Sequence, residues 1–369
     1  MLHVQEELFD SALNQLSSEL EAHPPTSAQP LPCDRWVARS VLQKAIRRGQ
    51  SALAQRALRN LLDHDERSVW RHLTVIAVED VGVANLGILD QLVAARRDRK
   101  WRRQAGGDLR IMNELVRQMA VSNHCQATCD LLLRAVNDPS LEQIRSFALE
   151  AASAELASLL WNPDEDILHR GIYALALGGG LAEGQNYSDP HAVLDIFADI
   201  MESQTAVDTC REAWKACRNP MTLLLPIINE KWVLNYDRFV VDDECPAGEV
   251  IEGVPGYALD QFTRIGNNIS RALLSEDDEL KALLNTVGIS SALHSRAVGD
   301  LLFLVEGGHL TARTRWPTGD LLRHPFRQLS SVSHFGSLLP DALEHIRSKA
   351  RQIDFLRSLH FHPVRQKLF

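Results

Sequence analysis

The chain has 369 residues, of which 45% are apolar and 24% are charged, with only 20 Gly and 15 Pro. This composition supplies enough apolar surface to offset chain entropy, so disordered, collagen-like and low-complexity classes are excluded. The net charge of −9 argues at first against a nucleic-acid partner, because phosphate binding needs clustered Lys and Arg.

The charge is unevenly distributed along the chain. Residues 1–34 carry six acids and no Lys or Arg, and residues 118–308 carry 29 acids against 12 bases. By contrast, residues 35–117 carry 17 bases against 9 acids, and residues 309–369 carry 10 against 4. The average therefore hides two basic segments, where DNA is expected to bind, on either side of an acidic middle.

The N-terminal sequence predicts no targeting signal, because acids stand where a secretory signal has Lys or Arg before an apolar core. The longest apolar stretches, around 221–228 and 171–182, are much shorter than the roughly 20 residues of a membrane span. We therefore expect a cytoplasmic protein without membrane contact, whose six cysteines are reduced.

Apolar residues recur at intervals of three and four almost throughout, which predicts an all-α, multi-helix globular bundle. A first helix ends before Pro24, where prolines begin a linker. Later helices are predicted at 36–48, 51–62, 67–80, 85–103, 107–121, 124–137, 139–160, 164–179, 190–203, 205–217, 220–230, 257–274, 276–286, 290–305 and 338–358.

One segment departs from the helical period. Residues 232–256 alternate apolar side chains loosely with acids, Gly and Pro, which indicates an irregular segment or a β-hairpin. Three parts are expected along the chain: an N-terminal helix and linker (1–34), a basic helical domain (35–137) and a second helical domain (138–369).

The densest positive charge lies in the predicted helix 85–103, where Trp101 stands among six bases. These are Arg96, Arg97, Arg99, Lys100, Arg102 and Arg103. Two interpretations are open. The bases form either a solvated helix end or a DNA-backbone strip in which Trp101 stacks on a base or packs inward.

Paired helices, AIRRGQSALAQRALRNLL, precede Arg71-His72-Leu73, which runs into AVEDVGVA at residues 77–84. Over about residues 36–135 this pattern resembles the helical C-terminal part of the replication-associated recombination AAA+ ATPases, the MgsA/RarA family. In that family the corresponding run closes with Glu-Asp-Val-Gly. The resemblance implies a DNA-transaction setting and self-association as a homo-oligomer, because the family's helical domain takes part in oligomerisation.

The same resemblance supplies no catalytic residue. No Gly-x-x-x-x-Gly-Lys-Ser/Thr occurs in the chain, so it lacks the family's nucleotide-binding motor. Glu79 and Asp80 either end a helix that Gly82 caps, or form a second polar site with Arg71 and His72, one or two helical turns back.

A second notable segment runs from Val254 to Asn268, where a Pro-Gly turn opens the predicted helix 257–274. Helical spacing places four polar residues on one face beside an apolar stripe: Asp260, Thr263, Arg264 and Asn267. Two interpretations are again open, because Asp260 and Arg264 form either an ordinary surface pair or part of a polar pocket.

The pocket suggests cleavage of a base from its sugar, as in a metal-independent DNA glycosylase of repair or phage defence. This reaction needs a carboxylate near the anomeric carbon, an aromatic slot for the flipped base and polar groups at its edge. Asp260 is the candidate carboxylate and Tyr257 or Trp232 the stacking surface. The candidate readers are Gln261, Arg264 and Asn267; no metal or cofactor is expected.

Two alternatives remain open: a non-catalytic DNA-binding or oligomerising adaptor of replication or recombination, and a helical protein-interaction scaffold whose acidic middle binds a basic partner. Acid runs such as Asp242-Asp243-Glu244 are also of the kind that binds Mg²⁺ in nucleases. His124, Cys125 and Cys129 resemble metal ligands, but no second Cys/His pair follows at finger spacing, which favours buried helix cysteines.

Overall fold

The computed structural model describes residues 2–24, 29–181, 189–200, 204–246, 248–323 and 332–362. Most of these residues are helical and the strands are few and short, so the predicted all-α class with a small β insertion is confirmed. The chain forms two compact units, each assembled from segments that are discontinuous in sequence.

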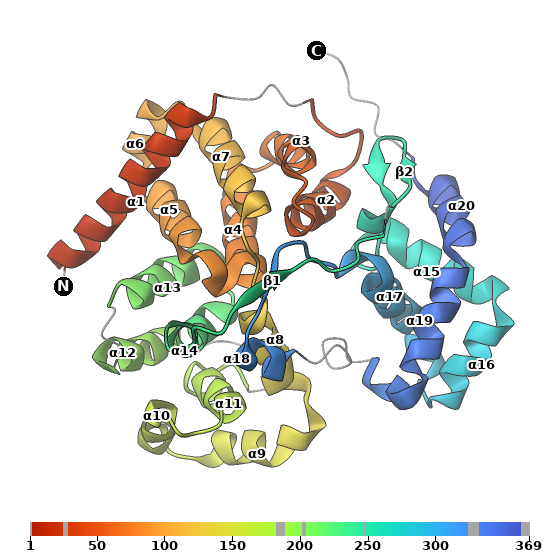
Figure 1. The fold of residues 1–369 in the computed structure, drawn as a ribbon. Coiled ribbons are helices and arrows are strands. Elements are labelled where there is room, and N and C mark those ends of the chain that lie inside the picture. Colours follow the sequence, from red (N-terminus) through yellow and green to blue (C-terminus); the bar gives the residue numbers. More distant parts are fainter. Residues whose placement is uncertain are drawn as a thin grey trace. The chain divides into compact units, whose positions relative to one another are not determined.

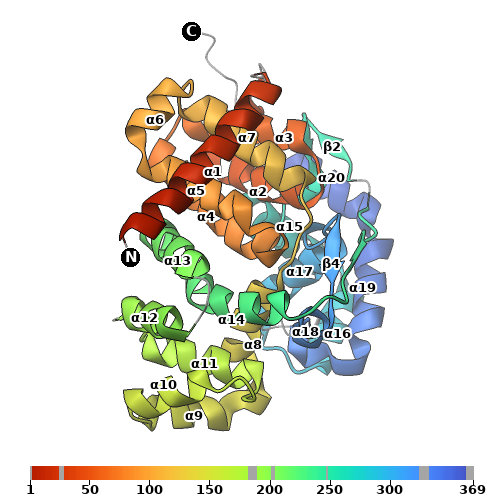
Figure 2. The same ribbon diagram turned by 60° about the vertical axis from the view of Figure 1, so that its left-hand side comes forward.

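Unit 1 comprises Met1–Pro25, Arg67–Val241 and Ala312–His324. Its helices are α1 (Leu2–Ala22), α4 (Glu66–Ile76), α5 (Leu86–Arg97), α6 (Arg99–Gln104), α7 (Asp108–Val121), α8 (Ala127–Asn137), α9 (Glu142–Glu150), α10 (Ser153–Trp161), α11 (Ile167–Leu177), α12 (Pro190–Ile200), α13 (Gln204–Cys217), α14 (Met221–Val233) and α18 (Pro317–Leu322). The first helix packs along α5 and α7 (Figure 1 and Figure 2), and α14 packs against α8, α11 and α13.

Unit 2 comprises Thr26–Glu66, Asp242–Thr311 and Pro325–Phe369. Its helices are α2 (Arg35–Arg47), α3 (Ser51–Leu62), α15 (Arg264–Glu276), α16 (Asp278–Thr286), α17 (His294–Leu302), α19 (Leu339–Ser348) and α20 (Ala350–His360). A helical hairpin of α2 and α3 buries Leu42, Ile46 and Leu58 completely, and α15 packs against α17 and α20. Each buried leucine or isoleucine contributes roughly 1.5–3 kcal/mol relative to an exposed one.

These units differ from the three consecutive parts predicted from sequence. The predicted basic domain 35–137 is divided between them, because 35–66 belongs to unit 2 and 67–137 to unit 1. Likewise, the predicted second domain 138–369 contributes to both. Composition changes along a chain cannot show that a unit is built from segments far apart in sequence.

The predicted irregular segment 232–256 contains three short strands. β2 (Val250–Ile251) and β3 (Val254–Pro255) form a tight antiparallel hairpin, whose two turn residues, Glu252 and Gly253, both have positive φ, as a type I′ turn requires. β1 (Phe239–Val241) instead pairs with the distant β4 (Arg313–Arg315), which lies where only a connection was predicted.

Several predicted helices are interrupted. The predicted helix 139–160 consists of a 3-10 turn, η3 (Pro139–Leu141), followed by α9 and α10, which the extended residues Ala151 and Ala152 separate. The predicted helix 85–103 breaks at Asp98, whose side chain accepts from the Trp101 amide (2.8 Å) and so starts α6. The last residues of the predicted helix 190–203 lie outside the described part of the chain.

A continuous helical run leads from α4 through a π-helical turn, η1 (Ala77–Val81), and a 3-10 turn, η2 (Gly82–Asn85), into α5. Among the described residues this run, Glu66–Arg97, is the one long and apolar enough to cross a membrane, but 67% of its most apolar window is buried. The run is therefore typical of a core helix rather than a membrane span.

Candidate functional site

Asp260 does not lie on the predicted helix. The helix α15 begins at Arg264, with Thr263 as N-cap, because the Thr263 hydroxyl accepts from the Gly266 amide at 3.0 Å. Asp260 precedes this cap in a tight turn, where a β-carbon at Gly266 would lie 1.9 Å from the Asp260 carbonyl oxygen. The predicted helical face of Asp260, Arg264 and Asn267 is therefore wrong.

The Asp260 carboxylate is sealed inside unit 2. Its side chain is 2% exposed and lies 2.8 Å from the ammonium nitrogen of Lys44, which is 4% exposed. Lys44 also donates to the Ser40 hydroxyl (2.7 Å), and Ser40 donates to the Ala258 carbonyl (2.7 Å). This chain of contacts ties α2 to the 3-10 turn η4 (Gly256–Ala258), and no surface pair with Arg264 forms.

Other residues predicted for the Asp260 pocket are dispersed. Arg264 is exposed, and the Asn267 side chain donates to the carbonyls of Gln261 (3.0 Å) and Thr263 (2.9 Å). Trp232 belongs to unit 1, where it meets Trp316 edge to face at 5.3 Å between ring centroids. The structure therefore brings no aromatic slot and no set of base readers to the Asp260 carboxylate.

Tyr257, in contrast, lines a cavity of about 730 Å³ in unit 2. Its wall consists of Arg48, Gly49, Gln50, Ser51, Ala52, Leu53, Arg56, Cys245, Pro246, Gly248, Val250, Gly253, Pro255 and Tyr257. The Tyr257 ring lies 3.7 Å from the Arg48 guanidinium, measured to the ring centroid. Burial raises the pKa of the Tyr257 hydroxyl to about 12. Arg48 and Arg56 were not predicted as site residues. The run RRGQS at residues 47–51 contains Arg48 and marks a helix end, a glycine and a new helix start.

The second predicted polar site comprises Arg71, His72, Glu79 and Asp80. Asp80 is fully buried and accepts from the Gln126 amide (2.8 Å), whose oxygen accepts from Arg313 (3.3 Å). Arg71 is exposed, and within the described chain no hydrogen bond or ion pair joins it to Glu79 or Asp80.

Glu79 and Asp80 lie in the π-helical turn η1, while His72 is buried on α4. Gly82 ends the turn with φ +53°, and a β-carbon there would lie 2.3 Å from the Cys125 carbonyl oxygen. Gly82 therefore has the positive φ of the predicted cap, but its ψ of −141° differs from that of a left-handed helical cap, and the helical run continues through η2 into α5.

Four of the six predicted DNA-backbone residues are exposed on the surface of unit 1. They are Arg97, Arg99, Lys100 and Arg103, at the break between α5 and α6. Arg102, by contrast, is buried: it donates to the Ala95 carbonyl (3.0 Å) and lies 2.5 Å from the Asp108 carboxylate. Its role is to hold the α5–α6 turn, so it is not a backbone contact.

Arg96, the sixth predicted residue, is half-buried at the end of α5. Partial burial lowers the pKa of its guanidinium; Glu212 opposes this shift, and the charge of Arg67 on α4 adds to it. The guanidinium of Arg97 lies over the ring of Phe9 on α1, with 5.3 Å between Cζ and the ring centroid. We call the exposed set Arg97, Arg99, Lys100 and Arg103 the α5–α6 strip.

The C-terminal basic segment offers fewer available charges. Arg313 is buried, Arg315 pairs with Asp320, and Arg357 is buried against Glu306. His324 and the last residues lie outside the described chain. Most of the described arginines of the segment 309–369 therefore pair with groups of the protein itself.

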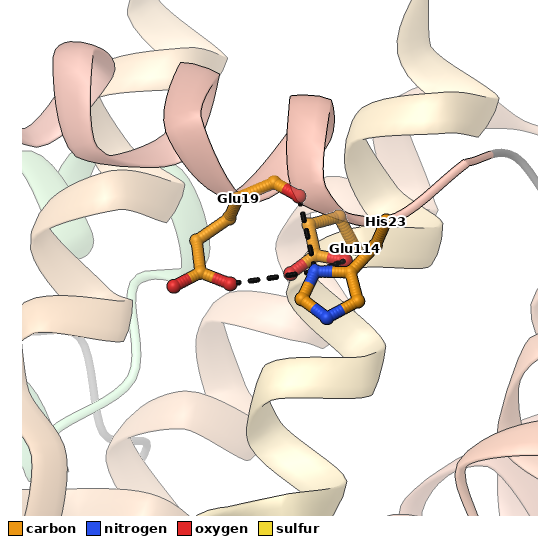
Figure 3. Close-up of side chains that lie close together, drawn as sticks. All are labelled: Glu19, His23 and Glu114. Carbon is orange, nitrogen blue, oxygen red and sulfur yellow. Dashed lines mark hydrogen bonds and ion pairs between the residues drawn. The ribbon is translucent and has the colours of Figure 1, made fainter.

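One cluster in unit 1 resembles a metal site. Glu19 and His23 extend from α1 and Glu114 from α7, with possible ligand atoms within 4.8 Å of one another (Figure 3). Arg117, however, donates to Glu19 at 3.0 Å and to both Glu114 oxygens at 2.9 and 2.7 Å. The guanidinium already supplies positive charge to both carboxylates, which favours a polar tie between the two helices.

No protein-family model, no curated protein and no solved structure matches the chain. The resemblance to the MgsA/RarA family therefore rests on the residues within 36–135 alone.

Proposed function

We propose that this protein is a cytoplasmic, non-catalytic DNA-binding adaptor of replication, recombination or repair, which contacts the DNA backbone through the α5–α6 strip. The carrying observation is the exposure of four cations within seven residues at this helix break. Arg99, Lys100 and Arg103 have no ion-pair partner within the described chain, so their charge is available to phosphates.

Local structure supports this role. Asp98 accepts from the Trp101 amide at 2.8 Å and so fixes the start of α6 within the strip. Buried Arg102 braces the turn from inside by donating to the Arg96 carbonyl at 2.6 Å. The strip is thus held on a structured turn rather than on a flexible tail, which reduces the ordering cost of binding.

Base excision by Asp260 receives less support from the geometry. A general base or stabilising carboxylate must lie within hydrogen-bond reach of the reacting group. Asp260 is 2% exposed and paired with Lys44, and it is absent from the wall of the 730 Å³ cavity. The function that remains best supported is binding, with the MgsA/RarA resemblance favouring a replication or recombination setting and self-association.

The test measures binding of the full chain to a short fluorescent duplex by anisotropy, between about 50 and 200 mM salt. Replacing all four strip residues by Ala should weaken binding by about 10- to 100-fold at the lower salt concentration. It should also reduce the slope of log affinity against log salt by about 3 to 4, because each phosphate contact contributes about 0.9.

A matched control removes four exposed arginines of unit 2, Arg264, Arg271, Arg347 and Arg351, and so changes the net charge equally. Equal affinity and equal salt slope in the two variants would remove the strip from the function. Alkali-sensitive strand breaks with modified duplex would instead restore base excision. Sedimentation with and without DNA tests the proposed self-association.

A further inference from the structure

The cavity beside Tyr257 lies entirely in unit 2, between the turn that joins α2 to α3, the first residues of α3 and the β2–β3 hairpin. Its volume of about 730 Å³ is within the range of small-molecule sites. None of its lining residues belongs to the α5–α6 strip, which is part of unit 1. Its ligand can therefore be inferred independently of the proposed DNA contact.

The charge of the wall is positive. Arg48 and Arg56 line the cavity, and none of its lining residues is an Asp or a Glu. Arg48 is 8% exposed, and its terminal nitrogens donate to the carbonyls of Pro246 (2.9 Å) and Glu306 (2.6 Å). The Arg48 Nε is buried without a hydrogen-bond partner in the described chain. The nearby Glu306 carboxylate is bonded to Arg357.

The second cation is more open. Arg56 is partly exposed and donates through Nε to the Gln29 carbonyl at 3.1 Å. No other hydrogen bond or ion pair engages its two terminal nitrogens within the described chain. These nitrogens form one edge of a planar fork, which suits two oxygens of a phosphate.

The first turn of α3 provides backbone donors on the same wall. The amides of Ser51, Ala52 and Leu53 precede the first internal hydrogen bond of the helix, which Ala54 makes to the Gln50 carbonyl (3.0 Å). Gln50 does not cap them with its side chain, because its amide oxygen accepts from the Tyr257 hydroxyl. The helix dipole at this end favours an anion.

We propose that this cavity binds a phosphate monoester. The phosphate lies at the first turn of α3, between Arg48 and Arg56, where cations and amides converge. The volume exceeds what a phosphate needs, and Leu53, Val250 and Pro255 offer apolar wall to an organic group. A nucleoside 5′-monophosphate, free or at the end of a nucleic acid, has this chemistry.

The experiment is calorimetric titration of the full chain with AMP, adenosine, inorganic phosphate and a 5′-phosphorylated dinucleotide. AMP should bind, inorganic phosphate should bind more weakly, and adenosine should give no measurable heat. Stronger binding of the dinucleotide than of AMP identifies a nucleic-acid end as the source, and weaker binding identifies a free nucleotide. Equal binding of AMP and adenosine overturns the proposal, as does the absence of heat with every phosphate.

Two variants separate binding from folding. Arg56→Gln removes the open cation, and Ala52→Asp places an acid at an exposed position of the first turn of α3. An acid there favours the helix through its dipole but repels a phosphate, so lost binding cannot be attributed to unfolding. Each should weaken AMP binding at least tenfold.

The control is Ala154→Asp, which adds the same acid to the exposed first turn of α10 in unit 1 and should leave AMP affinity unchanged. AMP affinity should also be unchanged when the α5–α6 strip is replaced by Ala. Unaltered binding in Ala52→Asp would overturn the assignment of the phosphate to α3. An equal loss in the strip variant would show that AMP binds the strip instead.

Discussion

Asp260→Ala tests whether Asp260 is a structural residue. The substitution leaves the Lys44 ammonium, which is 4% exposed, without the carboxylate that lies 2.8 Å away. Removing one partner of a buried pair costs about 3–5 kcal/mol. The ammonium group would still be stabilised in part by its hydrogen bond to the Ser40 hydroxyl. It would also keep its contacts with the rings of Phe262 and Phe303, whose centroids lie 5.6 and 5.9 Å away. We therefore expect about 2–4 kcal/mol of destabilisation.

The assay is a double-mutant cycle with urea unfolding followed by circular dichroism. Lys44→Met alone should also destabilise, because within the described residues it leaves the buried Asp260 carboxylate with the Phe262 amide as its remaining donor (3.2 Å). Lys44→Met combined with Asp260→Ala removes both charges and should recover much of the loss, giving a coupling energy of about 2 kcal/mol or more. Full stability of Asp260→Ala together with lost DNA chemistry would refute this reasoning and return Asp260 to a catalytic role.

Two further predictions concern the backbone and pH. Gly82→Ala should lower the free energy of unfolding by about 3 kcal/mol or more, because φ is +53° and the new β-carbon would lie 2.3 Å from the Cys125 carbonyl oxygen. The control Gly107→Ala, at φ +87° with open space around the new β-carbon, should cost about 1 kcal/mol, as measured by thermal unfolding. Burial alone would raise the pKa of Asp277, but hydrogen bonds from a backbone amide, His345 and a lysine lower it to about 2. The folded pKa of Asp277 lies below the unfolded value near 3.9, so the ionised carboxylate stabilises the folded state by about 1–2 kcal/mol after screening. This stabilisation is present above about pH 4 and is lost as pH falls towards 2. Acid titration of unfolding should show a smaller loss in His345→Gln, and an identical profile would contradict the assignment.

The helical class was predictable because it depends on local periodicity. Leu42 and Ile46 on α2, like Ala54 and Leu58 on α3, lie four residues apart, and the structure buries each of them. The start of α15 was predicted at residue 257, directly after the Pro-Gly turn, whereas the helix begins at Arg264 with Thr263 as its N-cap. Thr263 is a better N-cap than the Pro-Gly turn, because its hydroxyl accepts from the amide three residues later, at Gly266. The absence of a β-carbon at Gly266 also avoids a clash with the Asp260 carbonyl oxygen.

The candidate site was less predictable because its partners are distant in sequence. Periodicity places Asp260 on a local face, but it cannot show that Lys44 closes over it from α2. Tyr257 was chosen as a stacking residue and does line a cavity, yet Arg48 occupies its ring face. The RRGQS motif contains a detectable signal, since Gly49 separates two helices and leaves an uncapped start beside arginines.

The two proposed sites use positive charge differently, which makes them separable in solution. Binding of duplex DNA to four cations of the α5–α6 strip releases condensed counterions, so its affinity should fall steeply with salt, with a log-log slope of about −3 to −4 from these contacts. A phosphate monoester carries no such counterion atmosphere, and in the α3 cavity it meets the buried Arg48, whose interactions salt screens only weakly. AMP affinity should therefore fall by less than about tenfold between 50 and 200 mM salt. If the affinities for AMP and for duplex DNA fell equally with salt, and AMP competed with duplex DNA that lacks a terminal phosphate, one site would bind both ligands.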